Sequence, residues 1–486
     1  MWPNLRKLLT CLTPLAISVV LTFAVTTAFA SDGQAVVTTV DLASADSAIE
    51  NPQTFPAKSV LTPVDEAFLD DMEKRGIRYY IDEADPKTGL MPDRASANGG
   101  PSANGSPCSV AAVGFGLTAL CIGDERGWVD HQEAYDRSLR VLRFLRDHTV
   151  QVHGFFYHFV NMQTGARVWN CEVSDIDTAL LMGGVLTVRQ HFPGTALAKL
   201  ADEMYENVDW PWMVSQDGTM YMGWHPADAD GGEDKGFILS RWNQFSEGPP
   251  LIYLLGMGSK THPLPASIWK AWKRGPVETY DGMTFMECPP LFTHQYPQSW
   301  LDLRGVRDDY ADYFRDSQLA TLAQWHWCAS ELSKHFATYS RNVWGITASD
   351  SAAGYTAWGG PPVQGDIDGS VVPCAAGGSL AFEPRLCLDA LETMKARWGA
   401  KAYRKYGFVD AFNPVVGWYN PDVLGIDLGP MVLSAENCRS GFVWKTEMSC
   451  PEIQAALKAA GFRPLTTADN VSTTSLFSSS VVAVKG

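Results

Sequence analysis

The chain has 486 residues, with 54 acidic against 38 basic side chains and a formal net charge of −16. A protein this acidic repels nucleic-acid phosphates and anionic lipid surfaces, so neither is an expected partner. A neutral substrate or a small cation fits the charge better, and the length allows one large domain or two smaller ones.

The first 30 residues have the pattern of a secretory signal peptide. Arg6 and Lys7 precede an apolar run over 8–28, and Ala28-Phe29-Ala30 fits a small-residue cleavage site. An uncleaved membrane anchor is the alternative, because the apolar run is long for a signal. We expect cleavage, export to the periplasm or the medium, and no membrane insertion afterwards.

The rest of the chain divides into a leader, a domain and a tail. Residues 31–61 are polar and small, without periodicity, and predict a flexible leader. Residues 466–486 are rich in Ser, Thr and Val and predict a disordered tail. Residues 62–465 between them are expected to form one folded domain.

The spacing of the cysteines gives no sign of a disulfide-bonded or metal-bound scaffold. Nine cysteines follow residue 30, without a CxxC pair or a metal-finger pattern. Cys121, Cys328 and Cys387 lie in apolar helical stretches, where a buried free thiol is the ordinary state. We therefore expect no disulfide scaffold.

Helix, turn and helix is the dominant pattern of the domain. The clearest helix covers 128–148, where Tyr135, Leu139, Leu142 and Leu145 form one apolar stripe. The others are expected over 65–83, 177–191, 195–208 and 316–336, and from Pro384, Pro430 and Pro451 onward, with Gly441 and Gly461 after the last two. Very apolar helices alternate with amphipathic ones, which predicts an inner and an outer layer compatible with a toroid of helical hairpins.

Two local features add detail to this pattern. Gly183-Gly184 lies inside an apolar helix and would let a second helix approach closely. Residues 213–236 interrupt the helices, and Gln216-Asp217-Gly218 is typical of a hairpin turn between short strands. We expect a small β-hairpin insertion on one rim.

The most informative stretch is 169–181. Ser174 followed three residues later by Asp177 is a variant of the capping box, ahead of an apolar helix. Glu172 then lies just outside the helix start, where it can be aimed into a cleft. The alternative is that these acids only cap the helix and favour its positive end.

A second acidic position is Glu247. It is followed by Gly248-Pro249-Pro250, so it lies at a rigid boundary and not on a solvated helix face. Glu172 and Glu247 together could supply the proton donor and the base of glycoside hydrolysis. A surface or capping role for Glu247 is an equal alternative.

Tryptophan and tyrosine gather outside the expected helices, beside Gly, Asn, Asp or His. Flat aromatic faces next to hydrogen-bonding groups suit sugar rings, although any single one is more often packing. The candidates for substrate contact are Trp169, Trp224, Trp242, Trp300, Trp344 and Tyr355.

Polar candidates come from two more segments. Residues 294–305 are expected to form a loop before a helix, where His294, Gln295, Asp302 and Arg304 fit hydroxyl contacts. A structural Asp302–Arg304 network is nearly as good an interpretation. Asp427 stands just before the helix expected at Pro430. The chain has no HExxH-like, P-loop, dinucleotide or GxSxG pattern, so no metal or cofactor is expected.

The ordered motifs together resemble a known family. They are 85–90, 169–181, 223–226, 262–265, 294–296, 342–350, 375–379, 406–413 and 425–430. In this order they resemble the bacterial glucoamylase-like domain that includes glycoside hydrolase family 144, over about residues 62–462.

The resemblance implies a mainly α fold, an (α/α)6 toroid of six helical hairpins, and an inverting β-1,2-glucanase that needs no cofactor. By position, Glu172, Asp177 and Glu247 would lie in the active cleft. The surroundings of Glu247 depart from the family pattern, since Phe245-Ser246 precede it and Gly248-Pro249-Pro250 follow.

The expected function is endo-acting hydrolysis of β-1,2-glucan to short oligosaccharides by a monomer. Glu172 or Glu247 would be the acid, and Asp177 or Asp427 would be the base or would orient one. Two alternatives remain: an exo-acting enzyme that releases sophorose, and a non-catalytic glycan-binding protein on the same fold.

Overall fold

The computed structural model describes residues 61–227, 235–361, 367–467 and 469, which belong to a compact unit beginning at Gln53. The expected signal peptide, nearly all of the leader and most of the tail lie outside the described residues. No helix in the described ranges is long and apolar enough to cross a membrane.

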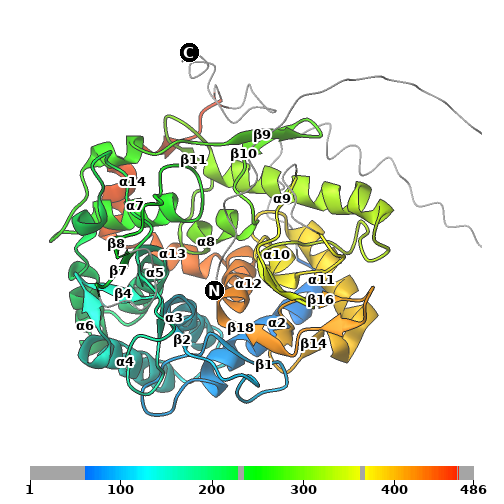
Figure 1. Ribbon diagram of the computed structural model, residues 1–486, viewed down its shortest axis with the longest axis horizontal. Helices are drawn as coiled ribbons and strands as arrows, with labels where there is room; N and C mark the ends of the chain where they lie inside the picture. Colours follow the sequence, from blue (N-terminus) through cyan, green and yellow to red (C-terminus); the bar gives the residue numbers. More distant parts are fainter. Residues whose placement is uncertain (1–60, 228–234, 362–366, 468, 470–486) are drawn as a thin grey trace, which may run out of the picture. The chain divides into compact units, whose positions relative to one another are not determined.

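Six helices with almost wholly buried side chains form an inner ring of the described unit (Figure 1). They are α3 (Val110–Glu125), α5 (Asp175–His191), α7 (Gly248–Gly258), α8 (Phe292–Trp300), α10 (Pro373–Gly377) and α12 (Gly425–Arg439). Each packs beside the next in this order, Gln295 of α8 reaching Ala375 O of α10, and α12 packs on α3. The ring is therefore closed.

An outer layer of helices covers this ring. It consists of α2 (Pro63–Asp82), α4 (His131–His148), α6 (Ala196–Glu206), α9 (Tyr313–Ser330), α11 (Pro384–Trp398) and α14 (Pro451–Ala459). Short helices complete it: α13 (Phe442–Glu447), η1 (Trp210–Met213), η2 (Ala266–Lys270), η3 (Leu332–Lys334) and η4 (Gly399–Lys401). The expected (α/α)6 architecture is confirmed.

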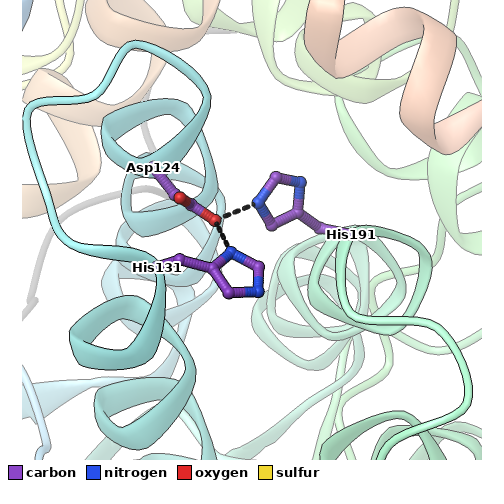
Figure 2. A group of neighbouring side chains, drawn as sticks. All are labelled: Asp124, His131 and His191. Carbon is purple, nitrogen blue, oxygen red and sulfur yellow. Dashed lines mark hydrogen bonds and ion pairs between the residues drawn. The ribbon is translucent and has the colours of Figure 1, made fainter.

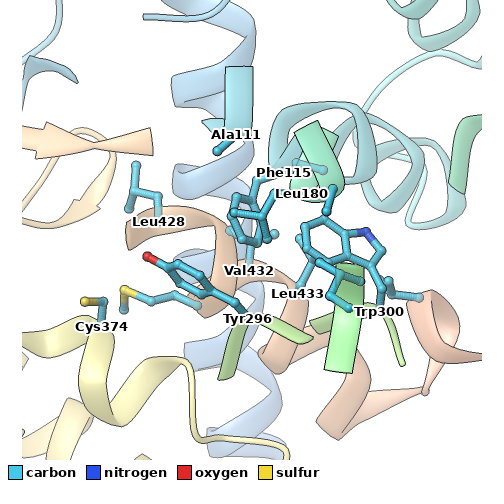
Figure 3. Close-up of a cluster of buried hydrophobic side chains, with 14 of the residues drawn as sticks. Ala111, Phe115, Leu180, Tyr296, Trp300, Cys374, Leu428, Val432 and Leu433 are labelled. Carbon is cyan, nitrogen blue, oxygen red and sulfur yellow. The ribbon is translucent and has the colours of Figure 1, made fainter. Parts of the chain in front are cut away.

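The centre of the ring is filled by large apolar side chains (Figure 3). Phe115 of α3 stacks on Trp300 of α8, with ring centroids 4.8 Å apart, and the edge of Tyr296 meets Phe115 at 5.8 Å. The indole Nε1 of Trp300 donates to Thr118 Oγ1 at 3.0 Å, so its polar atom is satisfied. The ring is therefore a packed core and not a channel at this level.

The inner helices start at a common end of the ring. The charge of Asp177, at the start of α5, acts on Glu247 at the start of α7. Asp427, at the start of α12, bonds to Cys374 at the start of α10, and Tyr296 is within reach of the charges of both Asp427 and Glu247. The positive ends of the helix dipoles thus converge on the acidic side chains gathered there.

The strands are short and lie around the helices. A five-stranded sheet joins β3 (Gln151–Val152), β4 (Phe155–Tyr157), β6 (Val173–Ser174), β7 (Trp224–His225) and β8 (Gly236–Phe237). The remaining described strands pair as β1 (Arg94–Ser96) with β18 (Asp422–Leu424), β2 (Cys108–Ser109) with β5 (Phe159–Val160), β9 (Val277–Tyr280) with β10 (Met283–Met286), β11 (Val306–Arg307) with β19 (Arg463–Pro464), β12 (Ser349–Ser351) with β13 (Gly354–Thr356), β14 (Tyr403–Arg404) with β15 (Gly407–Phe408), and β16 (Phe412–Asn413) with β17 (Trp418–Tyr419).

The expected rim insertion is present, with a different turn. Antiparallel β7 and β8 supply two strands of the five-stranded sheet next to the start of α5. The Gln216-Asp217-Gly218 turn joins only a single bridged pair, Val214 and Met220. Asp217 instead binds its own turn, accepting from the backbone N–H of Thr219 at 3.0 Å.

Two expectations about helices are wrong. Pro430 does not open a helix but lies inside α12, and residues 294–300 are not a loop but part of α8, which contains Pro297. An interior proline costs a helix about 3 kcal/mol. Burial on all sides within the ring offsets that cost, because most helical stability in proteins comes from packing.

The nine cysteines among the described residues are all free thiols, and Cys121, Cys328 and Cys387 are buried as expected. The tail begins with a local contact, since Asp469 accepts from Thr466 N and pairs with Arg463 at 2.8 Å.

Candidate active site

Glu172 and Asp177 are joined through a histidine that the sequence analysis did not single out. His158 Nδ1 lies 2.9 Å from Glu172 Oε1, and its Nε2 lies 3.4 Å from Asp177 Oδ1. The backbone fixes the pair as well, because His158 N–H donates to Glu172 O at 3.0 Å. The imidazole also stacks on Phe159, with centroids 3.8 Å apart.

The start of α5 holds this group rigidly. Ser174 is the N-cap, and its Oγ accepts from Asp177 N at 3.2 Å, as the capping-box variant predicts. The carboxylate of Asp177 turns back to the Ser174 hydroxyl at 2.5 Å. Glu172 therefore lies just outside the helix start, as expected.

Burial and mutual charge set the protonation states. Burial alone would lower the pKa of His158, but the charges of Asp177 and Glu172 outweigh it and raise that pKa to about 9. Burial pushes the pKa of Glu172 up, but the bond and charge of His158 hold it below its usual range. At neutral pH Glu172 is therefore a carboxylate beside an imidazolium.

The loop before Glu172 is strained. Trp169 and Asn170 have φ values of +58° and +52°, which non-glycine residues seldom adopt. The strain presents the indole of Trp169, which is 67% exposed and lies 5.0 Å from the Phe159 ring. An exposed aromatic face thus stands beside the His158 pair.

Glu247 lies at the start of α7 without capping it. It lines a cavity of about 520 Å³ together with Met222, Trp242 and Cys288. Burial, followed by the charge of Asp177, raises the pKa of Glu247 to about 7. The carboxyl group is therefore largely protonated below neutral pH, in contrast to Glu172.

The two carboxyl groups belong to one site. Met222 lines the Glu247 cavity, and a Cβ placed on the adjacent Gly223 would lie 3.1 Å from Glu172 Cγ. Asp177 acts electrostatically on both Glu172 and Glu247.

A second acidic group flanks the site at the start of α12. Burial, and then the charge of Asp410, raises the pKa of Asp427 well above its usual range, and the two carboxyls bond to each other. Asp410 also accepts from Asp350 N at 2.9 Å, and Asp350 is held by Arg94 at 2.8 Å. Asp410 and Asp427 thus share a proton, with Asp427 as the protonated partner.

Comparison with known proteins bears on this arrangement. Residues 240–451 match the family model described as putative glucoamylase. The crystal structure of a putative glucoamylase from Bacteroides fragilis is 30% identical, with a TM-score of 0.75 over 84% of this chain and 99% of that one. This chain belongs to the glucoamylase-like family. The resemblance seen in the sequence motifs is confirmed.

Two proteins that act on β-1,2-linked glucans are also similar to this chain. An endo-β-1,2-glucanase from Chitinophaga pinensis, solved with sophorotriose and glucose, is 28% identical with a TM-score of 0.75 over 82% of this chain and 98% of that one. An exo β-1,2-glucooligosaccharide sophorohydrolase from Parabacteroides distasonis is 28% identical over 465 residues, which are 87% of this chain and 61% of that protein. The chain thus spans about three fifths of that curated relative.

The structure brings several of the other candidates to the candidate active site. Trp224 is half-buried on β7 and pairs with Val173, next to Glu172. Trp242 forms a cavity wall, and its Nε1 donates to Asp175 at 2.9 Å. Tyr355 on β13 is 57% exposed and lies within reach of the charge of Asp427.

Four candidates are buried in the packed core and offer nothing to a substrate. His294 is buried against Phe245, and burial lowers its pKa to about 3. Gln295 donates to Ala375 O and Ser379 Oγ, both at 2.8 Å. Trp300 and Trp344 are fully buried. Sequence composition could not separate these side chains from site residues, because the helix around 292–300 was not recognised.

Asp302 and Arg304 also lie away from the site. They follow the C-terminal end of α8 and pair with each other at 2.8 Å, while the guanidinium of Arg304 stacks over Trp444 at 4.2 Å. The structure therefore contains the structural Asp302–Arg304 network, which was the alternative interpretation of these two residues.

The donor atoms of His158, Glu172 and Asp177 lie within 4.8 Å of one another, a spacing that a metal ion could also use. In this structure the same atoms form ion pairs between His158 and the two carboxylates.

Proposed function

We propose that this protein hydrolyses β-1,2-linked glucan, with Glu247 as the proton donor and Glu172 as the base. The observation that carries the proposal is the pair of carboxyl groups at one site whose environments push their pKa values apart. Such a pair is the requirement of acid–base catalysis on a glycosidic bond.

In the proposed reaction Glu247 gives its proton to the glycosidic oxygen as the bond to the anomeric carbon breaks. Glu172 takes a proton from the water that attacks the anomeric carbon on the opposite face, which inverts its configuration. His158 keeps Glu172 ionised, and Asp177 holds His158 in place, so both are positioning residues.

Three observations support a neutral glucan as the substrate. The chain is acidic, and exposed Trp169 and Tyr355 offer faces on which sugar rings stack. A solved relative carries sophorotriose, and the curated relative acts on β-1,2-glucooligosaccharides. Ionised Glu172 and protonated Glu247 favour catalysis over glycan binding alone.

Endo-acting cleavage is the first candidate mode. The endo-acting relative is covered over 98% of its length, whereas the exo-acting one is covered over 61%. Exo-acting release of sophorose is the second candidate, supported by 28% identity to the sophorohydrolase over 465 residues. Export by residues 1–30, and action as a monomer, complete the proposal.

The test is product analysis after incubation with linear β-1,2-glucan, with β-1,3-glucan and starch as controls. A spread of short oligosaccharides from the β-1,2 polymer alone supports endo cleavage, and a single disaccharide supports the exo mode. Glu247→Gln and Glu172→Gln should each lower kcat by about 10²–10⁴-fold and leave binding measurable. Normal turnover by either variant would refute its assigned role.

A further inference from the structure

Three side chains from three helices converge at the other end of the inner ring (Figure 2). Asp124 lies in the last turn of α3, His131 is the first residue of α4, and His191 is the last residue of α5. His131 Nδ1 lies 2.6 Å and His191 Nε2 2.7 Å from the same oxygen, Asp124 Oδ2. The two rings point at one carboxylate oxygen from different sides.

Local structure holds these side chains in place. Asp130 caps α4 by accepting from the N–H groups of residues 132 and 133, which fixes the backbone of His131. Phe192 packs against both imidazoles, with ring centroids 5.1 Å from His131 and 4.7 Å from His191. The orientation of the donor atoms is therefore set by packing before any ligand arrives.

We propose that Asp124, His131 and His191 form a binding site for a divalent first-row transition metal ion such as Zn²⁺. Two imidazole nitrogens and one carboxylate oxygen are a ligand set that such ions accept, and water would complete the coordination. The side chain of His131 is 69% exposed, so an ion can enter and keep a water ligand.

The distances require a small adjustment only. Bonds of about 2.0–2.2 Å in tetrahedral geometry place ligand atoms about 3.4 Å apart. The two nitrogens lie 2.6 and 2.7 Å from Asp124 Oδ2, so both contacts have to lengthen by roughly 0.7–0.8 Å, through a shift of the carboxylate away from the two rings or of the rings away from it.

The surrounding charge favours a cation. Residues 124–133 also carry Glu125, Asp130 and Glu133. The nearby arginines are paired with acids, Arg126 with buried Glu436 at 2.7 Å and Arg189 with Glu452 at 2.8 Å. Two nitrogen donors disfavour Mg²⁺ and Ca²⁺, which prefer oxygen ligands. The bound ion would tie α3, α4 and α5 together away from Glu172 and Glu247, so the inference stands apart from the proposed hydrolysis.

The experiment uses the full-length protein after chelator treatment, titrated with Zn²⁺, Co²⁺ or Mg²⁺. We expect one equivalent of Zn²⁺ or Co²⁺ to bind, the midpoint of thermal unfolding to rise by roughly 2–4 °C, and Mg²⁺ to have no effect. Bound Co²⁺ should give the visible spectrum of a nitrogen and oxygen site, without the charge-transfer band of a thiolate.

His131→Ala should abolish the bound equivalent and the thermal shift, and its exposed position makes misfolding a small concern. The matched control is His153→Ala, because His153 pairs with Asp209 at 2.9 Å in an exposed contact without a second histidine. Absence of binding to the wild type, a thiolate band, or equal binding by His131→Ala would overturn the proposal.

Discussion

His158 is the residue on which the charge of the candidate active site depends. Its two ring nitrogens face two different carboxylates, so a proton on the ring stabilises both. Two acids this close would otherwise raise each other's pKa. The imidazolium therefore allows Glu172 to stay ionised in a partly buried position, which a base requires.

Replacing His158 by glutamine should change the pH profile of the reaction. Activity requires ionised Glu172 and protonated Glu247, so kcat/KM rises through a low pKa and falls through one of about 7. Without the imidazolium the pKa of Glu172 rises, so the acidic limb moves to higher pH. The profile of kcat/KM against pH measures this directly. If activity fell equally at every pH and the acidic limb of the profile did not move, His158 would have a structural role only.

Trp169 is a proposed substrate contact that the fold leaves exposed. Trp169→Ala removes one stacking face, which is worth about 0.5–1.5 kcal/mol, and should raise KM for β-1,2-glucan by roughly two- to tenfold while kcat changes little. Steady-state kinetics on defined oligosaccharides give both constants. Val64→Ala, at an exposed apolar position on α2, should change neither. An unaltered KM in Trp169→Ala would show that Trp169 does not contribute to substrate binding.

At the scale of elements, α3 and α5 approach so closely that only glycine fits between them. A Cβ at Gly184 would lie 2.1 Å from Gly114 O, and a Cβ at Gly114 would lie 2.1 Å from Leu180 O. The close approach predicted from Gly183-Gly184 is confirmed. Because the contact is with backbone, no side-chain movement can relieve an added methyl group.

Gly184→Ala should therefore destabilise the protein by roughly 2–3 kcal/mol, as overpacking of a rigid interior does. Chemical denaturation monitored by fluorescence and circular dichroism gives the difference. Gly360→Ala is the control, since its nearest neighbour would be an ordinary contact at 3.6 Å, and it should change stability by less than about 0.5 kcal/mol. Equal denaturation midpoints for the two variants would show that α3 and α5 can move apart to accept the added methyl group.

Helices with a cap or an amphipathic stripe were predictable, while inner helices without either were harder to find. The apolar stripe of residues 128–148 corresponds to α4, and Ser174 caps α5. By contrast α3 is apolar on all sides and gives no period, and α8 and α12 contain prolines that normally signal a boundary. Ring packing overrides local propensity in these helices.

At the scale of the whole molecule, the candidate active site also combines residues that local sequence features reveal with residues that they do not. Glu172 and Glu247 stood out because each precedes a helix start, a local feature of the sequence. His158 lies on a loop between β4 and β5, and Asp410 lies between β15 and β16, so nothing local marks either one. Strand pairing places them instead: β4 pairs with β6, which sets His158 beside Glu172, and Asp410 N donates to Asp422 O just before α12.

A partly buried charge cluster joins α12 of the inner ring to α2 of the outer layer. Arg439, at the end of α12, contacts three acids of α2: Glu66 at 2.8 Å, Asp70 at 2.5 Å and Glu73 at 3.1 Å. Its side chain is 5% exposed and that of Glu73 is fully buried. Removing one partner of a buried pair leaves the other charge uncompensated.

Arg439→Met should lower the free energy of unfolding by about 3–5 kcal/mol, measured by denaturant titration. Lys334→Gln, which breaks an exposed pair with Glu331, should cost under about 1 kcal/mol and is the control. Adding Glu73→Gln to Arg439→Met should recover part of the loss, because the amide needs no counter-charge. If Arg439→Met matched the control, packing of Gly76 against Val432 and the bond from Tyr80 to Gly425 O would suffice to hold α2 on α12, and the charges would be dispensable.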